Sequence, residues 1–283
     1  MDDRNLVILG HGYSAAALAA SLPPGWRVAG TTRSGETASK MKAAGVAPLI
    51  WEDAVAVDAA LRGASHVLAS MPPGSEGDPA LLRCGAALGD AKGLRWLGYL
   101  STTGVYGDRG GGWVDEDSPL EPVGRRGSAR VAAETGWAET GLPLHIFRLP
   151  GIYGPGRSAL DRVRRGSARR IVKPGQVFSR IHVADLARSV AASMERPMPG
   201  RAYNVADNEP APPQDVIAFA AELLGLPVPP DEPFETAEMS AMGRSFYGES
   251  KRVSNRRMRE ELGVEPDYPD YRAGLRAILA AGS

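Results

Sequence analysis

The sequence has little cysteine and no long apolar run. Its single cysteine, Cys84, cannot form an intramolecular disulfide, and no cysteine-based metal site can be built. One cysteine in 283 residues is typical of a reducing compartment, so we expect a cytoplasmic protein. No apolar run approaches 18 residues, which predicts no membrane-spanning helix and no membrane partner. The first residues lead directly into a strand pattern, so we expect no signal peptide.

An excess of charge of one sign is also missing, because 33 Lys+Arg balance 33 Asp+Glu. The two signs are nevertheless segregated along the chain. Residues 125–180 carry 11 arginines, one lysine and three acids, whereas residues 202–243 carry eight acids and no Lys or Arg. The basic segment either binds an anionic small-molecule substrate or pairs with the acidic segment. No aromatic platform accompanies these arginines, so we expect no nucleic-acid partner. The arginines concerned are Arg157, Arg162, Arg164, Arg165, Arg169, Arg170 and Arg180.

Apolar strand-like segments alternate with helix-like segments over the first ~150 residues, which predicts a parallel sheet with helices on both faces. This is the α/β, doubly wound Rossmann class. The expected strands are 5–10, 26–32, 46–51, 66–70, 94–101 and 144–149. The expected helices are 13–22, 37–44, 56–62, 80–88 and 128–140.

After residue 150 the pattern becomes irregular and predicts a smaller C-terminal α+β lobe. Residues 170–172 and 177–181 flank Lys173-Pro174-Gly175, which indicates a hairpin. We therefore assign residues 1–150, with about 183–206, to the Rossmann domain. Residues 151–182 and 207–283 form the small lobe. Further helices are expected at 184–195, 213–224, 254–262 and 271–280, with a strand at 201–206.

A glycine-rich turn joins the first expected strand to the first helix. Gly10-His11-Gly12-Tyr13-Ser14-Ala15 has the Gly-x-Gly-x-x-Ala spacing of a dinucleotide-binding turn. In such turns the first glycine permits the tight bend, and the second lets the backbone approach a pyrophosphate. The small third residue lets helix pack on strand, and the helix N-terminus attracts the phosphates. The alternative is a glycine turn kept only for packing. His11 is either a phosphate contact or a solvated loop residue.

The end of the second strand indicates which dinucleotide binds. An NAD site usually has an acid about 20 residues after the glycines, which binds the ribose hydroxyls. Here the strand ends Gly30-Thr-Thr32-Arg33-Ser34, without an acid. A guanidinium at Arg33 suits a 2′-phosphate, with Thr32 beside it. We therefore expect NADP rather than NAD, the alternative being a solvated arginine at a strand end.

Four further motifs follow in a characteristic order. They are Ser101-Thr-Thr-Gly-Val-Tyr-Gly107, Arg148-Leu-Pro-Gly-Ile-Tyr-Gly-Pro155, Ile181-His-Val-Ala-Asp185 and Tyr203-Asn-Val-Ala-Asp207. With the glycine turn, they make the chain resemble the extended short-chain dehydrogenase/reductase superfamily, and within it the nucleoside-diphosphate-sugar epimerases and dehydratases. The resemblance covers nearly the whole chain. It implies an NAD(P)-binding Rossmann domain with a small C-terminal substrate lobe.

The superfamily uses a Tyr-x-x-x-Lys pair on the helix after the fifth strand, with Tyr as general acid/base. Counting from Pro122 places Arg126 at the Tyr position, Arg130 at the Lys position and Glu134 at a closing Glu. No Tyr-x-x-x-Lys occurs in the chain, so the sequence resembles an atypical branch. A guanidinium cannot exchange a proton near neutral pH. Arg126 could stabilise an oxyanion or clamp a phosphate, and Arg130 could donate to ribose hydroxyls; both could also be solvated.

Other candidate groups come from the resemblance and from strand ends. Thr102 lies where the superfamily has a substrate-orienting hydroxyl, the alternative being a capping or packing threonine. Tyr106 or Tyr153 could replace the missing acid, the alternative being a packing tyrosine. His182 either titrates at the site or is a satisfied structural histidine. The nicotinamide end would be flanked by Ser101, Arg130, Pro150, Gly151 and Ile152. We expect no metal site.

Together these features predict an NADP-binding, epimerase/reductase-like enzyme with a non-standard active site, acting on a small or nucleotide-linked anionic substrate. The alternative is a non-catalytic NADP-binding sensor or regulatory protein. The sequence leaves the substrate, the proton donor and the oligomeric state open.

Overall fold

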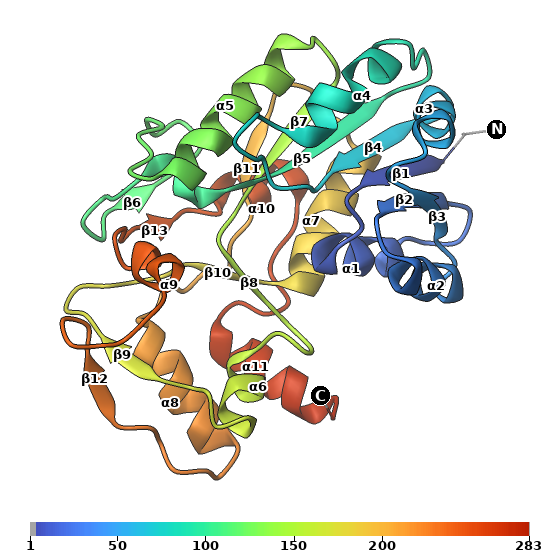
Figure 1. Cartoon of the computed structure of the whole chain (residues 1–283). Helices are drawn as coiled ribbons and strands as arrows, with labels where there is room; N and C mark the ends of the chain where they lie inside the picture. The colour runs from blue at the N-terminus through green and yellow to red at the C-terminus, as the bar shows by residue number, and fades with distance from the viewer. Residues whose placement is uncertain (1–3, 283) are drawn as a thin grey trace. The chain divides into compact units, whose positions relative to one another are not determined.

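A computed structural model describes residues 4–282 (Figure 1). The chain divides into two compact units, each built from several segments. The first unit comprises the residues up to Thr102, Ser128–Arg148 and Leu186–Tyr203. The second comprises Thr103–Gly127, Leu149–Asp185 and the residues from Asn204 onward. The sequence placed residues 103–127 with the Rossmann domain, whereas contacts group them with the second unit.

The first unit is built on a seven-stranded sheet with strand order β11-β7-β5-β4-β1-β2-β3. The central pairs are parallel: Leu6 of β1 lies beside Val28 of β2 on one side and His66 of β4 on the other. The predicted α/β class with a central parallel sheet is confirmed. The strands are β1 (Asn5–Leu9), β2 (Arg27–Thr32), β3 (Ala47–Ile50), β4 (His66–Ala69), β5 (Trp96–Thr102), β7 (Leu144–Leu149) and β11 (Ala202–Asn204).

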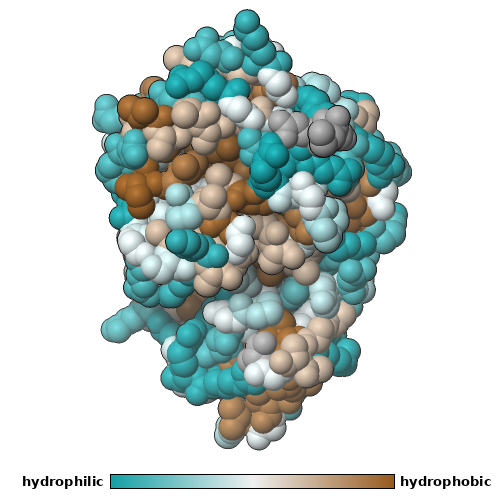
Figure 2. Space-filling model, turned by 90° about the vertical axis from the view of Figure 1, so that its right-hand side faces the viewer, coloured by the Kyte–Doolittle hydropathy of each residue, from teal (hydrophilic) through white to brown (hydrophobic). Residues whose placement is uncertain are grey.

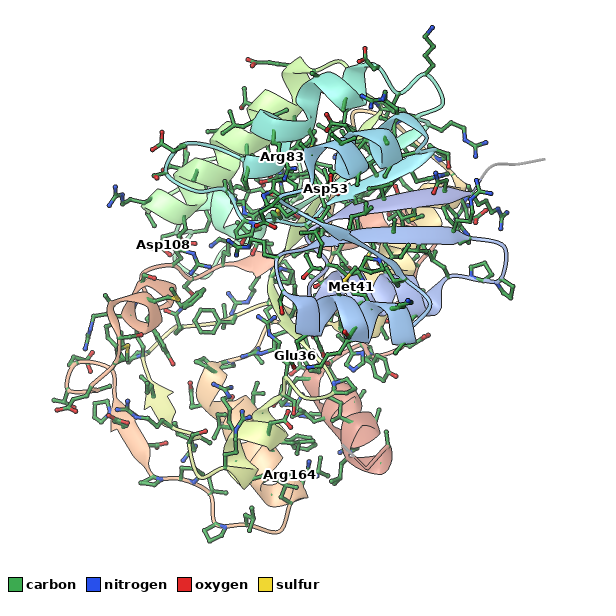
Figure 3. All side chains as sticks on the ribbon, turned by 45° about the vertical axis from the view of Figure 1, so that its right-hand side comes forward. Glu36, Met41, Asp53, Arg83, Asp108 and Arg164 are labelled. Atoms are coloured by element: carbon green, nitrogen blue, oxygen red, sulfur yellow. The ribbon has the colours of Figure 1, made fainter. Side chains whose placement is uncertain are left out.

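Helices alternate with these strands, and polar residues mark where several of them begin. The Ser34 hydroxyl accepts from Thr37 N at the start of α2, and the Asp53 carboxylate accepts from Ala56 N at the start of α3. Asp53 is labelled in Figure 3. Such caps satisfy backbone donors that have no partner within the helix. The helices are α1 (Tyr13–Ser21), α2 (Gly35–Ala43), α3 (Ala54–Arg62), α4 (Pro79–Gly89), α5 (Arg125–Glu139) and α7 (Val183–Glu195).

Aromatic side chains fill part of the first unit's core. Trp96 is fully buried, and its indole nitrogen donates to Ser193 Oγ at 3.0 Å. The ring stacks on His145 with centroids 5.7 Å apart. It also lies across Gly98, where an added Cβ would come within 2.1 Å of the indole.

The second unit has its own core, in which α6, α8 and α11 pack together around Leu160, Ile217 and Leu275. Its sheets are small parallel pairs: β8 with β10, β9 with β12 and β6 with β13. The strands are β6 (Trp113–Val114), β8 (Gly151–Tyr153), β9 (Arg170–Val172), β10 (Arg180–His182), β12 (Asp231–Pro233) and β13 (Arg252–Val253). The helices are α6 (Ala159–Arg164), α8 (Pro213–Leu223), α9 (Ala241–Phe246), α10 (Arg256–Leu262) and α11 (Tyr271–Ala280), with a 3-10 turn at Thr103–Tyr106.

The expected hairpin around Lys173-Pro174-Gly175 is wrong. A tight turn does form, since Gln176 N donates to Lys173 O at 3.1 Å and Gly175 has a φ of 75°. The strands on either side then part, and β9 pairs with β12 while β10 pairs with β8. A turn motif fixes the bend only, whereas partners distant in sequence decide the pairing.

Large exposed apolar side chains are few, and they are spread over both units. The most exposed are Val55 (80%) and Leu82 (67%), followed by Trp113, Val123 and Met242 at 62% each. On the face shown in Figure 2, apolar patches alternate with hydrophilic residues. Among the described residues, no helix combines the length and apolar character that crossing a membrane requires.

Candidate functional site

The glycine turn of the first unit has the geometry that its sequence predicts. Gly10 has a φ of 93°, which side-chain-bearing residues rarely adopt, and an added Cβ would lie 2.5 Å from Met71 Cγ. The Thr31 hydroxyl accepts from Gly10 N at 2.8 Å and fixes the turn against β2. At Gly12, by contrast, an added Cβ would meet no atom within 4 Å. The chain is therefore packed on one side of the turn and open at Gly12.

The N-terminus of α1 follows this opening. Gly12 is its N-cap and supplies no side-chain hydrogen bond, and the first turn has no acid. The predicted residues Tyr13 and Ser14 begin the helix, while Ala15 is fully buried and allows close packing. An uncapped helix start beside an open glycine fits a dinucleotide pyrophosphate.

His11 lies at the same turn and is half-buried, and burial lowers the pKa of its imidazole. Within the described part of the chain its buried Nε2 has no hydrogen-bond partner. A neutral ring with one unused nitrogen is compatible with either predicted role of His11.

Arg33 follows β2 and is exposed. Its side chain has no ion pair with any described residue. The neighbouring Thr32 hydroxyl accepts from Ser34 N at 3.2 Å, which holds the turn that presents Arg33. The guanidinium is thus available for an anion, as the sequence predicts, and the 2′-phosphate contact stays a prediction.

A buried charge network joins three elements of the first unit. Ser101 Oγ donates to Glu134 Oε1 at 2.5 Å, and Arg148 Nη2 pairs with Glu134 Oε2 at 2.9 Å. Ser101, Glu134 and Arg148 are each at most 6% exposed. The network connects the end of β5 with α5 and β7. Ser101, expected near the nicotinamide, thus uses its hydroxyl proton to hold Glu134.

Arg130 also points at the end of β5. Its Nη1 donates to Leu100 O at 2.6 Å and to the Tyr99 hydroxyl at 3.0 Å. Burial raises the pKa of Tyr99 above its usual range. Arg130 is therefore held at Leu100, two residues before the half-buried Thr102 that ends β5. Its predicted contact with a ribose stays a prediction.

Arg126 lies one helical turn before Arg130 on α5, so both project from the same side of that helix. It is exposed, and its guanidinium carbon lies 5.1 Å from the centre of the Phe246 ring, at the end of α9. This cation–π contact belongs to the second unit.

The remaining predicted residues come together on β8 and β10 of the second unit. Pro150 precedes β8, Gly151 and Ile152 lie in it, and Tyr153 is in register with His182 of β10. The two rings meet edge to face with centroids 5.3 Å apart.

Tyr153 and His182 both have other partners. The Tyr153 hydroxyl donates to Asp270 O at 3.3 Å, and burial raises its pKa far above the usual range. His182 Nδ1 accepts from Ala184 N at 3.3 Å, which leaves its proton on Nε2, and burial lowers its pKa. The ring also packs 3.9 Å from Tyr268. Burial therefore disfavours the charged form of both groups.

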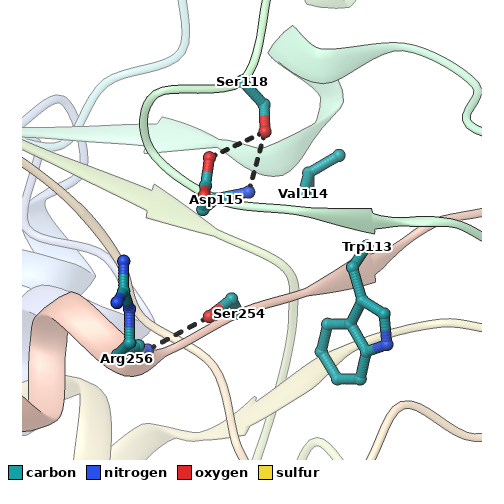
Figure 4. A pocket seen from close by; sticks show the side chains of 6 residues that line it. All are labelled: Trp113, Val114, Asp115, Ser118, Ser254 and Arg256. Atoms are coloured by element: carbon teal, nitrogen blue, oxygen red, sulfur yellow. Dashed lines mark hydrogen bonds between the residues drawn. The ribbon is translucent and has the colours of Figure 1, made fainter.

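A further cavity in the second unit involves none of the predicted site residues (Figure 4). It has a volume of about 430 Å³ and is lined by Trp113, Val114, Asp115, Ser118, Ser254 and Arg256. Ser118 Oγ donates to Asp115 Oδ1 at 2.8 Å and so orients this carboxylate. In the sequence, a signal for this site was the large aromatic Trp113 in an otherwise polar, glycine-rich segment.

No family model and no curated protein matches the chain. Among solved structures, a functionally unknown conserved protein from Silicibacter pomeroyi DSS is 52% identical, with 99% of each chain covered and a TM-score of 0.93. The chain belongs to the family of that protein. The name of this family member assigns no activity.

More distant neighbours carry named activities. A protein provisionally assigned as an NAD-dependent epimerase/dehydratase, from Methylobacillus flagellatus, is 27% identical over 99% of both chains, with a TM-score of 0.77. The UDP-glucuronic acid 4-epimerase of Bacillus cereus, solved with NAD, is 17% identical over 96% of both chains, with a TM-score of 0.75. The family therefore has the fold of NAD-dependent epimerases and dehydratases.

Proposed function

We propose that this protein is an NADP-dependent, epimerase/reductase-like enzyme with a non-standard active site, acting on a small or nucleotide-linked anionic substrate. The observation that carries the proposal is the open space at Gly12 before the uncapped N-terminus of α1. Such a turn can hold a pyrophosphate against backbone N–H groups. The fold shared with named epimerases and dehydratases supports an enzyme rather than the sensor.

The preference for NADP rests on Arg33, because it stands where an NAD site usually has an acid. The neighbours solved with a cofactor contain NAD. An arginine at this position favours a 2′-phosphate through a charge-assisted hydrogen bond.

NADP would supply or accept a hydride when bound. Arg126 is proposed to bind the oxygen of the reacting carbonyl and stabilise negative charge there. Arg126 cannot donate the proton itself, because a guanidinium has a pKa above about 12. Arg130 is held by Leu100 O and is proposed to donate to the cofactor ribose. Tyr106, Tyr153 and His182 are the candidate proton donors. The Tyr106 hydroxyl donates to Asn204 Oδ1 at 2.8 Å, and burial disfavours the charged forms of Tyr153 and His182.

The cofactor is tested first, by calorimetric titration of NADP and NAD into the full chain. We expect NADP to bind at least tenfold more tightly, and Arg33→Ala to remove this difference. Arg62→Ala removes another exposed arginine of the first unit and serves as the control. An equal affinity of the wild type for NAD and NADP would overturn the cofactor assignment.

Turnover is tested next, with NADPH and a panel of ketones and nucleotide sugars followed by absorbance at 340 nm. We expect Arg126→Ala to lower kcat by about a hundredfold, the usual effect of losing one oxyanion donor. Turnover unaffected by Arg126→Ala contradicts the proposed role. Tight NADP binding without turnover on the panel favours the sensor. Cytoplasmic location, and the lack of nucleic-acid and membrane partners, stay predictions.

A further inference from the structure

The cavity lined by Trp113 and Arg256 lies at the ends of two short strands of the second unit (Figure 4). β6 and β13 run parallel, with Trp113 beside Arg252 and Val114 beside Val253. The two valines are buried and fix the strand pair, whereas Trp113 is 62% exposed. The indole therefore contributes little to this packing, and its ring is available to a ligand in the cavity.

Two opposite charges, Asp115 and Arg256, line the same cavity. The Asp115 carboxylate is held by one of its oxygens. Its Oδ1 accepts from Ser118 Oγ at 2.8 Å and from Asp117 N at 3.2 Å. Its Oδ2 has no hydrogen bond to a described residue. The carboxylate is thus oriented by the turn that contains it, and one oxygen is left for another donor.

Arg256 differs from its neighbour at the start of α10. Arg257 forms an ion pair with Asp117, with Nη2 and Oδ2 2.7 Å apart. The guanidinium of Arg256 is exposed and has no ion pair with any residue that the structure describes, and the same holds for the Asp115 carboxylate. Neighbouring charges on the same two segments therefore pair with each other, whereas Asp115 and Arg256 line one cavity without pairing.

These two charges indicate the chemistry of a ligand. Arg256 attracts an anion that Asp115 repels, and the reverse holds for a cation. A molecule with both an ammonium group and a carboxylate gains from both charges, because a carboxylate accepts from an ammonium and a guanidinium can bind a carboxylate through two parallel hydrogen bonds. The Trp113 ring adds a flat apolar surface for stacking. Ligand pockets typically combine such a surface with a few polar groups that fix the orientation of the ligand.

We propose that this cavity binds a small zwitterion, namely a free amino acid with a flat side chain. Asp115 binds its ammonium group, Arg256 binds its carboxylate and Trp113 stacks on its side chain. The cavity volume of about 430 Å³ is in the range of small-molecule sites. The site contains no residue proposed to hold the cofactor or to act in turnover, so it is independent of the proposed function.

The test is calorimetric titration of the full chain with L-phenylalanine, phenethylamine and 3-phenylpropionate. The three probes share a phenyl ring, but they carry both charges, only the positive charge and only the negative charge, respectively. We expect phenylalanine to bind at millimolar concentration or below, and at least tenfold more tightly than either singly charged probe. Trp113→Leu should weaken phenylalanine binding severalfold with an unchanged melting temperature, because the exposed indole contributes little to packing.

The two charge variants should differ in their effects on the singly charged probes. Asp115→Asn keeps Oδ1 as an acceptor for Ser118. It should weaken phenylalanine binding about tenfold, the value of one hydrogen bond to a charged group, without weakening phenylpropionate binding. Arg256→Gln should weaken phenylalanine binding by a similar factor without weakening phenethylamine binding. Arg125→Gln removes an exposed arginine outside the cavity and should change none of these affinities.

The absence of phenylalanine binding at millimolar concentration overturns the site. So does phenylalanine binding that is indifferent to Trp113→Leu, Asp115→Asn and Arg256→Gln. A singly charged probe that binds the wild type as tightly as phenylalanine overturns the assignment to a zwitterion. Because no probe contains a nucleotide, these results leave the proposed NADP binding untouched, and a protein that binds phenylalanine but not NADP keeps this site.

Discussion

At the scale of single residues, pairing decides what each polar group can do. The Glu134 carboxylate is 4% exposed. It accepts a hydrogen bond from Ser101 and forms an ion pair with Arg148. Counting from Pro122 located Glu134 in the sequence, but nothing there identified Arg148 as its partner. The one available signal was an arginine inside an otherwise apolar strand, since a buried arginine needs a carboxylate. Predicting residue types was therefore easier than predicting their contacts.

His145 gives a prediction at this scale. Its Nε2 accepts from Met198 N at 2.8 Å, and burial lowers its pKa to about 4 from 6.5. Because the folded pKa lies below the unfolded one, the unfolded chain takes up the proton first as the pH falls. The contribution of His145 to stability is present above pH 6.5 and is lost between 6.5 and about 4. The loss amounts to about 3 kcal/mol of unfolding free energy.

Urea unfolding at several pH values checks this expectation. His145→Gln keeps an acceptor for Met198 N without a titrating group, so its stability should fall less than that of the wild type over this pH range. If the unfolding free energies of the two proteins depend on pH in the same way, His145 is not the group that causes the loss of stability at low pH.

At the scale of elements, local sequence predicted what local physics determines. The alternation of strands and helices through β5 follows from apolar periodicity, and the glycine turn before α1 follows from the backbone freedom of glycine. The structure contains both features. Short elements such as β12 and β13 were missed, because their strands pair with residues far away in the chain. β9 and β12, for example, are about 60 residues apart.

The α1 turn predicts opposite consequences for its two glycines. Gly10→Ala places a Cβ at a positive φ and against Met71, so we expect a loss of about 2 kcal/mol of unfolding free energy. Gly12→Ala meets no protein atom, so stability should change by less than about 0.5 kcal/mol. Its methyl group would nevertheless occupy the space proposed for the pyrophosphate, and NADP affinity should fall at least tenfold.

Thermal unfolding and NADP titration of both variants separate these effects. A stable Gly12→Ala protein with wild-type affinity for NADP contradicts binding at this turn.

At the scale of the whole molecule, part of the basic segment pairs with the acidic segment. Arg169 and Arg170 of the basic segment pair with Glu232 and Asp231 of the acidic one, as one interpretation of the sequence expected. Arg162 remains without such a pair. The pairing interpretation is therefore confirmed for these two arginines, and binding of an anionic substrate stays a prediction.

Because each unit is built from several segments, cutting the chain at residue 150 should not release a folded domain. A fragment of residues 1–150 lacks β11 and α7. The contacts it loses include Ile146 N to Arg201 O (2.9 Å), Trp96 Nε1 to Ser193 Oγ (3.0 Å) and the stacking of Phe147 on Tyr203. These losses leave buried donors without partners and core aromatics exposed. Thermal unfolding followed by circular dichroism should show no cooperative transition, and a sharp transition would contradict this prediction.

The indole of Trp96 lying across Gly98 has an evolutionary consequence. Any side chain at position 98 would overlap the ring, which is enclosed in the core and cannot swing away. These two positions cannot drift independently among descendants of this chain. A larger residue at 98 becomes acceptable only after Trp96 is replaced by a smaller one, so the order of the two substitutions is fixed.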